Sequence, residues 1–372
     1  MGWMSNPQGL VYHTDFKNSF AMTGTGAQNW RKRESPEYIR ISLAAAMVLG
    51  FKNGLFYRNA KSPCINILLT YDHGCAGNCA YCGLSMKRPG QFTEKSFIRV
   101  EWNVYEFEQV MDRIVQKKFE IERICISMVT NKRAVADTVK LINLIHKRID
   151  IPISVLSAPT VLKKEDFCKF KSEGAERIGI AVDTATPHLF ERFRGKGVRG
   201  PHRWERYWQA LKEAVEIFGR GNVGVHLIVG LGESEKEMVE TIQNAHNNGI
   251  ETHLFTFFPE PDSLLAAHQP PPIGQYRRIQ LARYLINNNL ATMNDLIFDQ
   301  KGRITEFLLD KNELSRIIET GKPFMTSGCP NKNGEVACNR PYSDCLPGED
   351  IRNFPFTPEK TDIEKIKREL FS

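Results

Sequence analysis

Short apolar runs alternate with helical periods from residue 65 to about residue 290, and this alternation constrains the fold more than any other feature. Each apolar run predicts a strand, at 65–71, 123–129, 153–157, 177–183, 223–230 and 251–258. Amphipathic segments typical of helices follow them at 103–117, 132–147, 163–172, 203–217, 234–248 and 275–288. Apolar strands joined by crossover helices form parallel sheets. Six such units predict an α/β fold closed wholly or partly into a barrel, with its chemistry at the carboxyl ends of the strands.

Two further regions flank the expected barrel domain at 61–290. Residues 1–60 are expected to form an N-terminal arm and a buried helix over 36–49, with Ser35 as its N-cap and Gly50 at its end. Residues 291–372 form a C-terminal extension, in which we expect a strand pair within 296–304 and a charged helix over 358–371. The part at 325–356 is rich in Gly, Pro, Asn and Cys, a composition that needs a metal or a docking surface to become ordered.

Composition places the chain among globular proteins and bounds its partners. The 372 residues are 41% hydrophobic and 25% charged, and the net charge is +7. That charge is too small to indicate nucleic-acid binding, and it favours an acidic partner. The longest apolar run, 41–51, is well short of the roughly twenty residues that span a membrane. We therefore expect a cytoplasmic protein without a signal peptide, a membrane anchor or a nucleic-acid partner.

A cysteine triplet lies in the loop after the first expected strand, where Cys75, Cys79 and Cys82 have the spacing C-x3-C-x2-C. Three close thiolates can hold three irons of a [4Fe–4S] cluster and leave the fourth iron without a protein ligand. The small residues around them allow the backbone to wrap closely around such a cluster. The alternative is a zinc site with His73 as a further ligand, although zinc sites usually pair C-x2-C with a second such pair.

A second set of cysteines lies in the C-terminal extension, at Cys329, Cys338 and Cys345. Turn-forming sequence surrounds them, which indicates a metal site, but spacing alone does not choose between zinc, another metal centre and free thiols. Cys64 is a further candidate ligand if the extension folds back to the start of the first strand. Cys125 and Cys168 are expected to be unligated thiols of the core and of a helix.

The first triplet, read as C-x3-C-x-aromatic-C after the first strand of six α/β units, resembles the signature of radical S-adenosylmethionine (SAM) enzymes over roughly residues 60–290. The resemblance implies a partial (β/α)6 TIM-like barrel. It also implies a [4Fe–4S] cluster that binds and cleaves SAM to a 5′-deoxyadenosyl radical, which abstracts hydrogen from an unactivated C–H bond. It further implies SAM contacts from Tyr81 to the adenine, Ser127 at the end of strand two, Asp183 to the ribose and Arg194 to the methionine carboxylate. A helix cap at Asp183 and a surface position for Arg194 are the alternatives.

The sequence Ser327-Gly328-Cys329-Pro330, followed by Cys338-Asn339-Arg340-Pro341-Tyr342, resembles the biotin-synthase-related branch of these enzymes, which includes the two-protein, archaeal-type lipoyl synthases. This implies a second, auxiliary [4Fe–4S] cluster as sulfur donor, with Cys329, Cys338, Cys345 and Cys64 as candidate ligands and Ser327 or Ser343 as a releasable one. The implied reaction is sulfur insertion into a protein-bound octanoyl chain. The implied partners are an octanoylated carrier (a lipoyl domain or glycine-cleavage H protein), a second radical SAM protein, and an electron donor such as ferredoxin or flavodoxin.

Three other functions stay open at this point. One is another reaction of the same branch on a small molecule, such as biotin-like sulfur insertion or a carbon rearrangement. The second is modification of a peptide. The third is a non-catalytic iron–sulfur electron carrier, although a six-unit barrel is far more structure than electron transfer requires.

Overall fold

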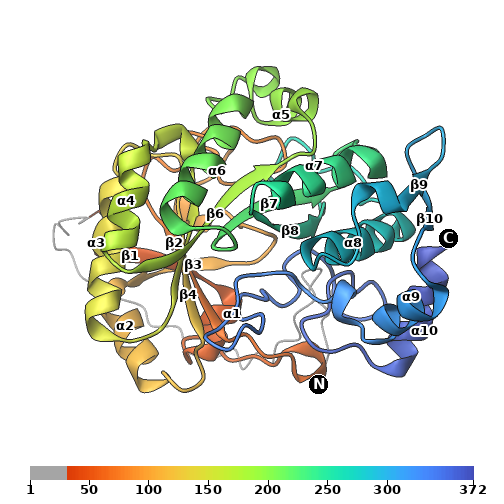
Figure 1. Cartoon of the computed structure of the whole chain (residues 1–372). Coiled ribbons are helices and arrows are strands. Elements are labelled where there is room, and N and C mark those ends of the chain that lie inside the picture. Colours follow the sequence, from red (N-terminus) through yellow and green to blue (C-terminus); the bar gives the residue numbers. More distant parts are fainter. Residues whose placement is uncertain (1–31) are drawn as a thin grey trace.

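The computed structural model describes residues 32–372, and its centre is a curved sheet of eight strands (Figure 1). Six neighbouring strands are parallel and coincide with the six apolar runs predicted from the sequence. They are β2 (Cys64–Leu69), β4 (Arg123–Ser127), β5 (Ile153–Ser157), β6 (Ala175–Asp183), β7 (Val223–Val229) and β8 (Glu251–Thr256). The predicted partial TIM-like barrel is therefore confirmed.

Helices cover the outer face of the sheet, as a parallel sheet requires. They are α2 (Phe107–Gln116), α3 (Ala134–Arg148), α4 (Lys164–Ser172), α5 (Pro187–Phe193), α6 (Trp204–Phe218), α7 (Glu235–Asn247) and α8 (Ile273–Asn287). Short 3₁₀ turns are η1 (Tyr57–Asn59), η2 (Phe92–Glu94), η3 (Pro159–Val161), η4 (Lys196–Val198), η5 (Met293–Asp295) and η6 (Lys322–Phe324).

The predicted helix over 36–49 is wrong in its first half. The chain forms β1 (Tyr38–Ser42) and only then α1 (Leu43–Val48). β1 is antiparallel to β2 and to β3 (Trp102–Glu106), which takes up the start of the segment predicted as the helix 103–117. Ser42, whose Oγ accepts the Ala45 N–H, is the N-cap, while the Ser35 Oγ accepts the Thr70 N–H. Residues 38–42 therefore form a strand because they pair with β2 and β3, although their local sequence favours a helix.

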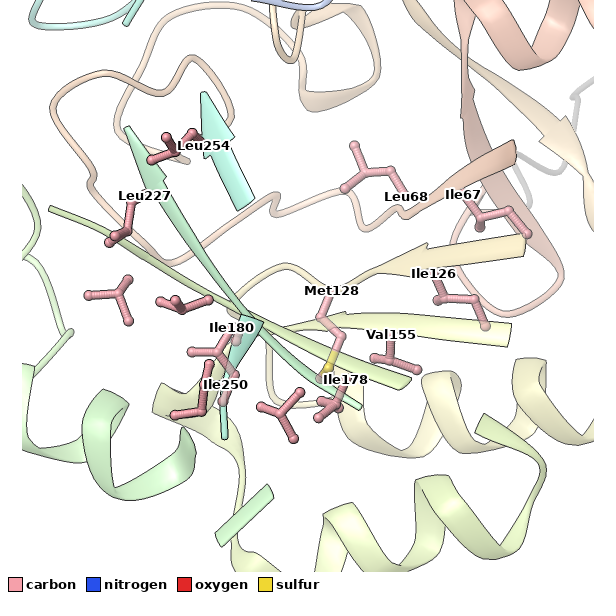
Figure 2. Close-up of a cluster of buried hydrophobic side chains, with 14 of the residues drawn as sticks. Ile67, Leu68, Ile126, Met128, Val155, Ile178, Ile180, Leu227, Ile250 and Leu254 are labelled. Atoms are coloured by element: carbon pink, nitrogen blue, oxygen red, sulfur yellow. The ribbon is translucent and has the colours of Figure 1, made fainter. Parts of the chain in front are cut away.

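Aliphatic side chains of the parallel strands and the covering helices form the main core (Figure 2). Ile67, Ile126 and Val155 are completely or almost completely buried in three consecutive parallel strands. The same cluster of contacts extends to Phe324, Phe354 and Ile366 in the C-terminal extension. The extension therefore packs on the barrel through a continuous apolar core.

The C-terminal extension contains the two elements that the sequence predicts. The strand pair is β9 (Leu296–Phe298) and β10 (Ile304–Phe307), and the charged helix is α10 (Lys360–Leu370). Between them lies α9 (Lys311–Glu319). No helix within residues 32–372 is long and apolar enough to cross a lipid bilayer.

Residues 325–356, called the closing segment below, lie along the edge of β8 that does not pair with β7 and reach a side chain of β2. On one side, the backbone N–H groups of Leu254 and Thr256 in β8 donate to Ser327 Oγ (3.0 Å) and Asp344 Oδ2 (3.1 Å). On the other side, the Asn66 amide in β2 contacts the Cys338 sulfur at 3.6 Å. The closing segment thus satisfies part of the edge of β8 that β7 leaves unpaired.

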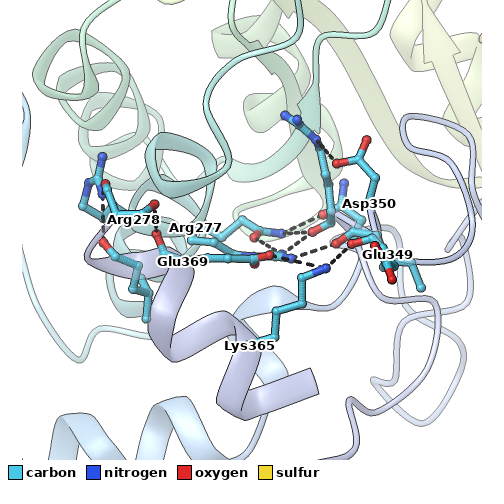
Figure 3. Close-up of polar contacts among 12 residues, drawn as sticks. Arg277, Arg278, Glu349, Asp350, Lys365 and Glu369 are labelled. Carbon is cyan, nitrogen blue, oxygen red and sulfur yellow. Dashed lines mark hydrogen bonds and ion pairs between the residues drawn. The ribbon is translucent and has the colours of Figure 1, made fainter. Parts of the chain in front are cut away.

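A buried ionic network fixes the closing segment to α8 and α10 (Figure 3). The Arg277 guanidinium, 1% exposed, donates to the carbonyls of Ile351 (2.7 Å) and Arg352 (2.6 Å) and to Glu369 Oε2 (2.8 Å). Arg278 pairs with Glu235 at 2.8 Å. Because each guanidinium meets several acceptors, the buried charges are compensated.

Candidate active site

The loop that leaves β2 carries the first cysteine triplet to the carboxyl end of the barrel. Cys75, Cys79 and Cys82 all line one large cavity in the barrel interior. The Cys75 sulfur receives the backbone N–H groups of Gly77 (3.3 Å) and Thr130 (3.4 Å). Burial raises the pKa of the Cys79 and Cys82 thiols, so a bound cation would be needed to keep them as thiolates. Sulfur ligands with aimed backbone donors fit an iron–sulfur cluster.

The predicted SAM contacts Tyr81, Asp183 and Arg194 meet beside this triplet and line the same cavity. The Tyr81 hydroxyl donates to Asp183 Oδ2 at 2.5 Å, and Arg194 Nη1 lies 3.1 Å from the same oxygen. Arg194 is 5% exposed, so it is no surface arginine, and the N-cap of α5 is Thr186 rather than Asp183. Both alternatives for these residues are therefore excluded.

The positions of Arg194, Asp183 and Ser127 determine which of their atoms can contact a ligand in the cavity. Arg194 also donates to the carbonyls of Ala181 and Val182, and within residues 32–372 only its Nε lacks a partner among its buried nitrogens. Asp183 has φ of +67°, an uncommon conformation for a residue other than glycine. Ser127 is buried in β4 and is not among the residues that line the cavity. The prediction of a Ser127 contact thus has no support from its position.

A histidine that the sequence reasoning missed also lines the cavity. The His202 Nδ1 lies 2.6 Å from Thr160 Oγ1 and 2.9 Å from the Tyr207 hydroxyl. Burial, with the nearby Arg194 and Arg203 charges, lowers the His202 pKa to about 2, so the ring is neutral. No motif surrounds this residue, and only the packing of η3 against α6 shows its position.

A second group of thiols lies deeper in the barrel, where the closing segment meets β2 and β4. Hydrogen bonds from the Cys125 and Cys64 thiols hold the pKa of the Cys338 thiol well below its ordinary value. Cys329 lines the same inner cavity as Cys125 and Cys338. The extension does fold back to the start of β2, which is the condition under which the sequence made Cys64 a candidate ligand.

Two cysteines lie elsewhere than the sequence predicted. Cys125, expected to be a simple core thiol, points from β4 into the second group. The structure does not bring Cys345 there, because its thiol receives the backbone N–H groups of Arg352 and Asn353 and its carbonyl accepts from Arg99 at 3.0 Å. Arg340 and Tyr342, at φ of +36° and +59°, turn the chain between Cys338 and Cys345. Spacing could not reveal this turn.

The other candidate ligands of the second group are also placed by the structure. The Ser327 Oγ is used by the Leu254 N–H, and Ser343 lines the outer cavity near the first triplet. Within residues 32–372, no three His, Cys, Asp or Glu side chains converge as the ligands of one metal ion would, which is what a zinc site requires.

The two thiol groups line two adjacent cavities of the barrel interior. Both cavities are lined by Leu156, His226, Phe255 and Arg340, so these residues form the partition between them. Cys125 lies five positions before Thr130, whose N–H reaches Cys75. At about 3.3 Å per residue of extended chain, the Cα atoms of Cys125 and Thr130 are at most on the order of 17 Å apart.

Comparison with known protein families identifies the family of this chain. The family model described as the Radical SAM superfamily matches residues 70–260, which include the first triplet and five of the six parallel strands, β4 to β8. The chain belongs to the radical SAM superfamily. Radical SAM proteins use a [4Fe–4S] cluster and SAM, so Cys75, Cys79 and Cys82 are the candidate ligands of that cluster here.

This radical SAM chain is distantly similar to several solved structures. Methylornithine synthase (PylB) is 13% identical, with a TM-score of 0.47 and 66% of each chain covered. The hydrogenase maturase HydG from Carboxydothermus hydrogenoformans is 16% identical, with a TM-score of 0.49, 79% of this chain covered and 74% of that one. Coproporphyrinogen III oxidase (HemN) from Escherichia coli is 17% identical, with a TM-score of 0.35 and coverages of 50% and 45%. The match to the first of these spans about two thirds of its length. A search of curated proteins found no match.

Proposed function

We propose that this radical SAM protein inserts sulfur into a protein-bound octanoyl chain, as a component of a lipoyl synthase. The observation that carries the proposal is the second thiol group, which lines a cavity adjacent to the one that the first triplet lines. In this proposal the bound cofactors supply hydrogen abstraction at one end of the cavity and a sulfur atom at the other. The barrel itself would hold the substrate carbon between them and exclude water.

The second cofactor would be an auxiliary [4Fe–4S] cluster held by Cys64, Cys125, Cys329 and Cys338. This set differs from the one expected from the sequence by the addition of Cys125 and the loss of Cys345. Arg340 lies beside these thiols and also lines the outer cavity, so its guanidinium is in place to compensate thiolate charge on the substrate side. His253, 4% exposed in the same inner cavity, has no hydrogen-bond partner for either ring nitrogen among the described residues. An unpartnered buried ring supports a ligand in this cavity.

The lining of the outer cavity supports an aliphatic substrate. Between the two thiol groups the wall is made largely of apolar side chains, including Leu68, Met128, Leu156, Ile228, Phe255 and Phe257. Such a lining favours a saturated chain over a polar metabolite. An octanoyl group attached to a carrier protein, either a lipoyl domain or a glycine-cleavage H protein, meets this requirement, and we propose a second radical SAM protein as the partner for the remaining sulfur insertion.

The outer surface over the first triplet supports an acidic electron donor such as flavodoxin or ferredoxin. Lys87, Lys196 and Arg199 are exposed, and in the described part of the chain none of them forms an ion pair. The Lys87 Nζ donates to the Arg199 carbonyl, and Arg88 donates to the Cys79 carbonyl at 3.3 Å. Lys196 begins η4 and Arg199 follows it, and the Val198 carbonyl of η4 accepts from Asn78 in the loop of the first triplet. Lys87, Lys196 and Arg199, called the cationic rim, thus lie beside the loop that would hold the cluster.

Reversing the charge of the cationic rim should slow reduction by a protein donor. We expect Lys196→Glu/Arg199→Glu to lower the rate of SAM cleavage driven by reduced flavodoxin about tenfold or more at low salt, because charge complementarity sets the association rate. Cleavage driven by dithionite should not change. Equal losses with both reductants would show that the substitutions damage the active site instead.

The function is tested by reconstituting the protein without oxygen and supplying SAM, dithionite and an octanoylated lipoyl domain. Mass spectrometry of the carrier should show added sulfur, with one 5′-deoxyadenosine formed for each C–S bond. Mössbauer spectroscopy should count about eight irons, and about four in Cys329→Ala/Cys338→Ala, which should still cleave SAM without adding sulfur. The proposal would be refuted if SAM were cleaved but the octanoylated carrier gained no sulfur, or if both proteins held about four irons. Either result would direct the search to small molecules and peptides.

A further inference from the structure

His202 lies beside the loop of the first triplet, at a point that none of the expected SAM contacts occupies. It is 2% exposed, between η4 and α6, and it lines the same cavity as Cys75 and Cys79. Its ring is held from one side only, by Thr160 and Tyr207. The other side of the ring is therefore available to a group inside the cavity.

Two hydroxyl groups lie within hydrogen-bond distance of His202 Nδ1, and each has a hydrogen that can be donated to this nitrogen. The Tyr207 oxygen accepts from Arg194 Nη2 at 3.3 Å, so the phenolic hydrogen is free to be donated to His202 Nδ1 at 2.9 Å. The Thr160 hydroxyl lies 2.6 Å from the same nitrogen. A neutral imidazole that accepts at Nδ1 is a donor at Nε2.

The Nε2 atom faces the Cys75–Gly77 turn. A Cβ placed on Gly77 would stand 3.0 Å from His202 Nε2 and 3.2 Å from the Cys75 sulfur. The ring nitrogen and the sulfur thus border the same small space, and only glycine leaves that space open. Gly77 and Thr130 already aim backbone N–H groups at this sulfur. In the described part of the chain, His202 Nε2 has no hydrogen-bond acceptor of its own.

We propose that His202 is a positioning residue for the radical cluster, whose Nε2–H donates to the cluster's sulfur atoms at Cys75. A reduced cluster carries one more negative charge than an oxidised one, so a donor aimed at its sulfur stabilises the reduced form. Hydrogen bonds to sulfur are among the main determinants of cluster potential. Thr160 and Tyr207 act one step further out, because they fix the tautomer and the orientation of the ring.

Two substitutions of His202 separate the role of Nδ1 from the role of Nε2. In His202→Asn the amide oxygen can replace Nδ1 as an acceptor, but the side chain does not reach the position of Nε2. In His202→Gln the longer side chain places an N–H donor near the position of Nε2. The readout is the midpoint potential of the cluster, from an EPR-monitored redox titration without substrate. The Cys329→Ala/Cys338→Ala background leaves one cluster in the protein, and wild-type protein, in which added SAM marks the signal of that cluster, serves as the second background.

We expect His202→Asn to lower the reduced-to-oxidised ratio at a fixed potential about tenfold, which equals about 59 mV for a one-electron couple. His202→Gln should restore most of the ratio. Equal potentials for wild type and His202→Asn would overturn the proposal, as would loss of the iron of the first triplet in both variants, which would show a purely structural role. Neither result depends on the octanoyl substrate, so this inference and the proposed function can fail separately.

Discussion

Cys125→Ala should remove about four irons from the reconstituted protein and abolish sulfur insertion, while SAM cleavage continues. The reason is geometric. Cys125 and Cys64 project from β4 and β2 toward Cys338, and a cluster that loses one of four thiolate ligands in a buried site loses much of its binding free energy. The first triplet lines the outer cavity, which Cys125 does not line, and does not share this ligand. Mössbauer spectroscopy and the yields of 5′-deoxyadenosine and sulfurated carrier measure the two effects separately.

Cys345→Ala is the matched control for this prediction. Cys345 is buried in the same closing segment, but its thiol is occupied by two backbone N–H groups rather than by other cysteines. We expect this variant to keep about eight irons and its sulfur-insertion activity. The opposite pattern, with iron lost from Cys345→Ala and kept in Cys125→Ala, would restore the ligand set expected from the sequence.

Arg277→Met should destabilise the protein by about 3–5 kcal/mol, the range for breaking a buried, hydrogen-bonded charge pair. The substitution would leave the Glu369 carboxylate and the Ile351 and Arg352 carbonyls without the guanidinium that satisfies them. The closing segment would lose part of its attachment to α8, to which Tyr276 and Gln280 also bind it. A fall in the midpoint of urea unfolding, followed by far-UV circular dichroism, measures the effect.

Lys365→Met provides the comparison, because Lys365 also approaches Glu369, at 3.8 Å (Figure 3). Its side chain is 44% exposed. Exposed pairs contribute less than about 1 kcal/mol, so the urea midpoint should barely move. Similar shifts for the two variants would mean that the Arg277 network is not a major source of stability.

The parallel strands were predictable because each is a short, continuous apolar run, a pattern that follows from burial on both faces. β1 was not, because Ile39 and Ile41 fit a buried helix as well as a strand, and only their register with Leu69 and Ile67 in β2 decides between the two. Such pairing joins residues about thirty positions apart, and local propensity carries no information about it.

The part of the site that lies within one loop was predictable, and the part that distant segments build was not. Cys75, Cys79 and Cys82 act within one loop, so their spacing alone indicates their chemistry. The second group draws Cys64 and Cys125 from two strands and Cys338 from the closing segment, and only the fold brings them together. His202 belongs to the same class, because its neighbours Thr160 and Gly77 lie far from it in sequence.

The position of the closing segment in chain order bears on how the protein matures. Residues 325–356 follow every strand of the sheet, so during synthesis all six parallel strands leave the ribosome before the closing segment does. Cys64 and Cys125 are then accessible from the side, and they become enclosed only when Cys338 arrives. A metal centre at this seam would be loaded as the segment docks, which makes cofactor insertion a step of folding rather than an event that follows it.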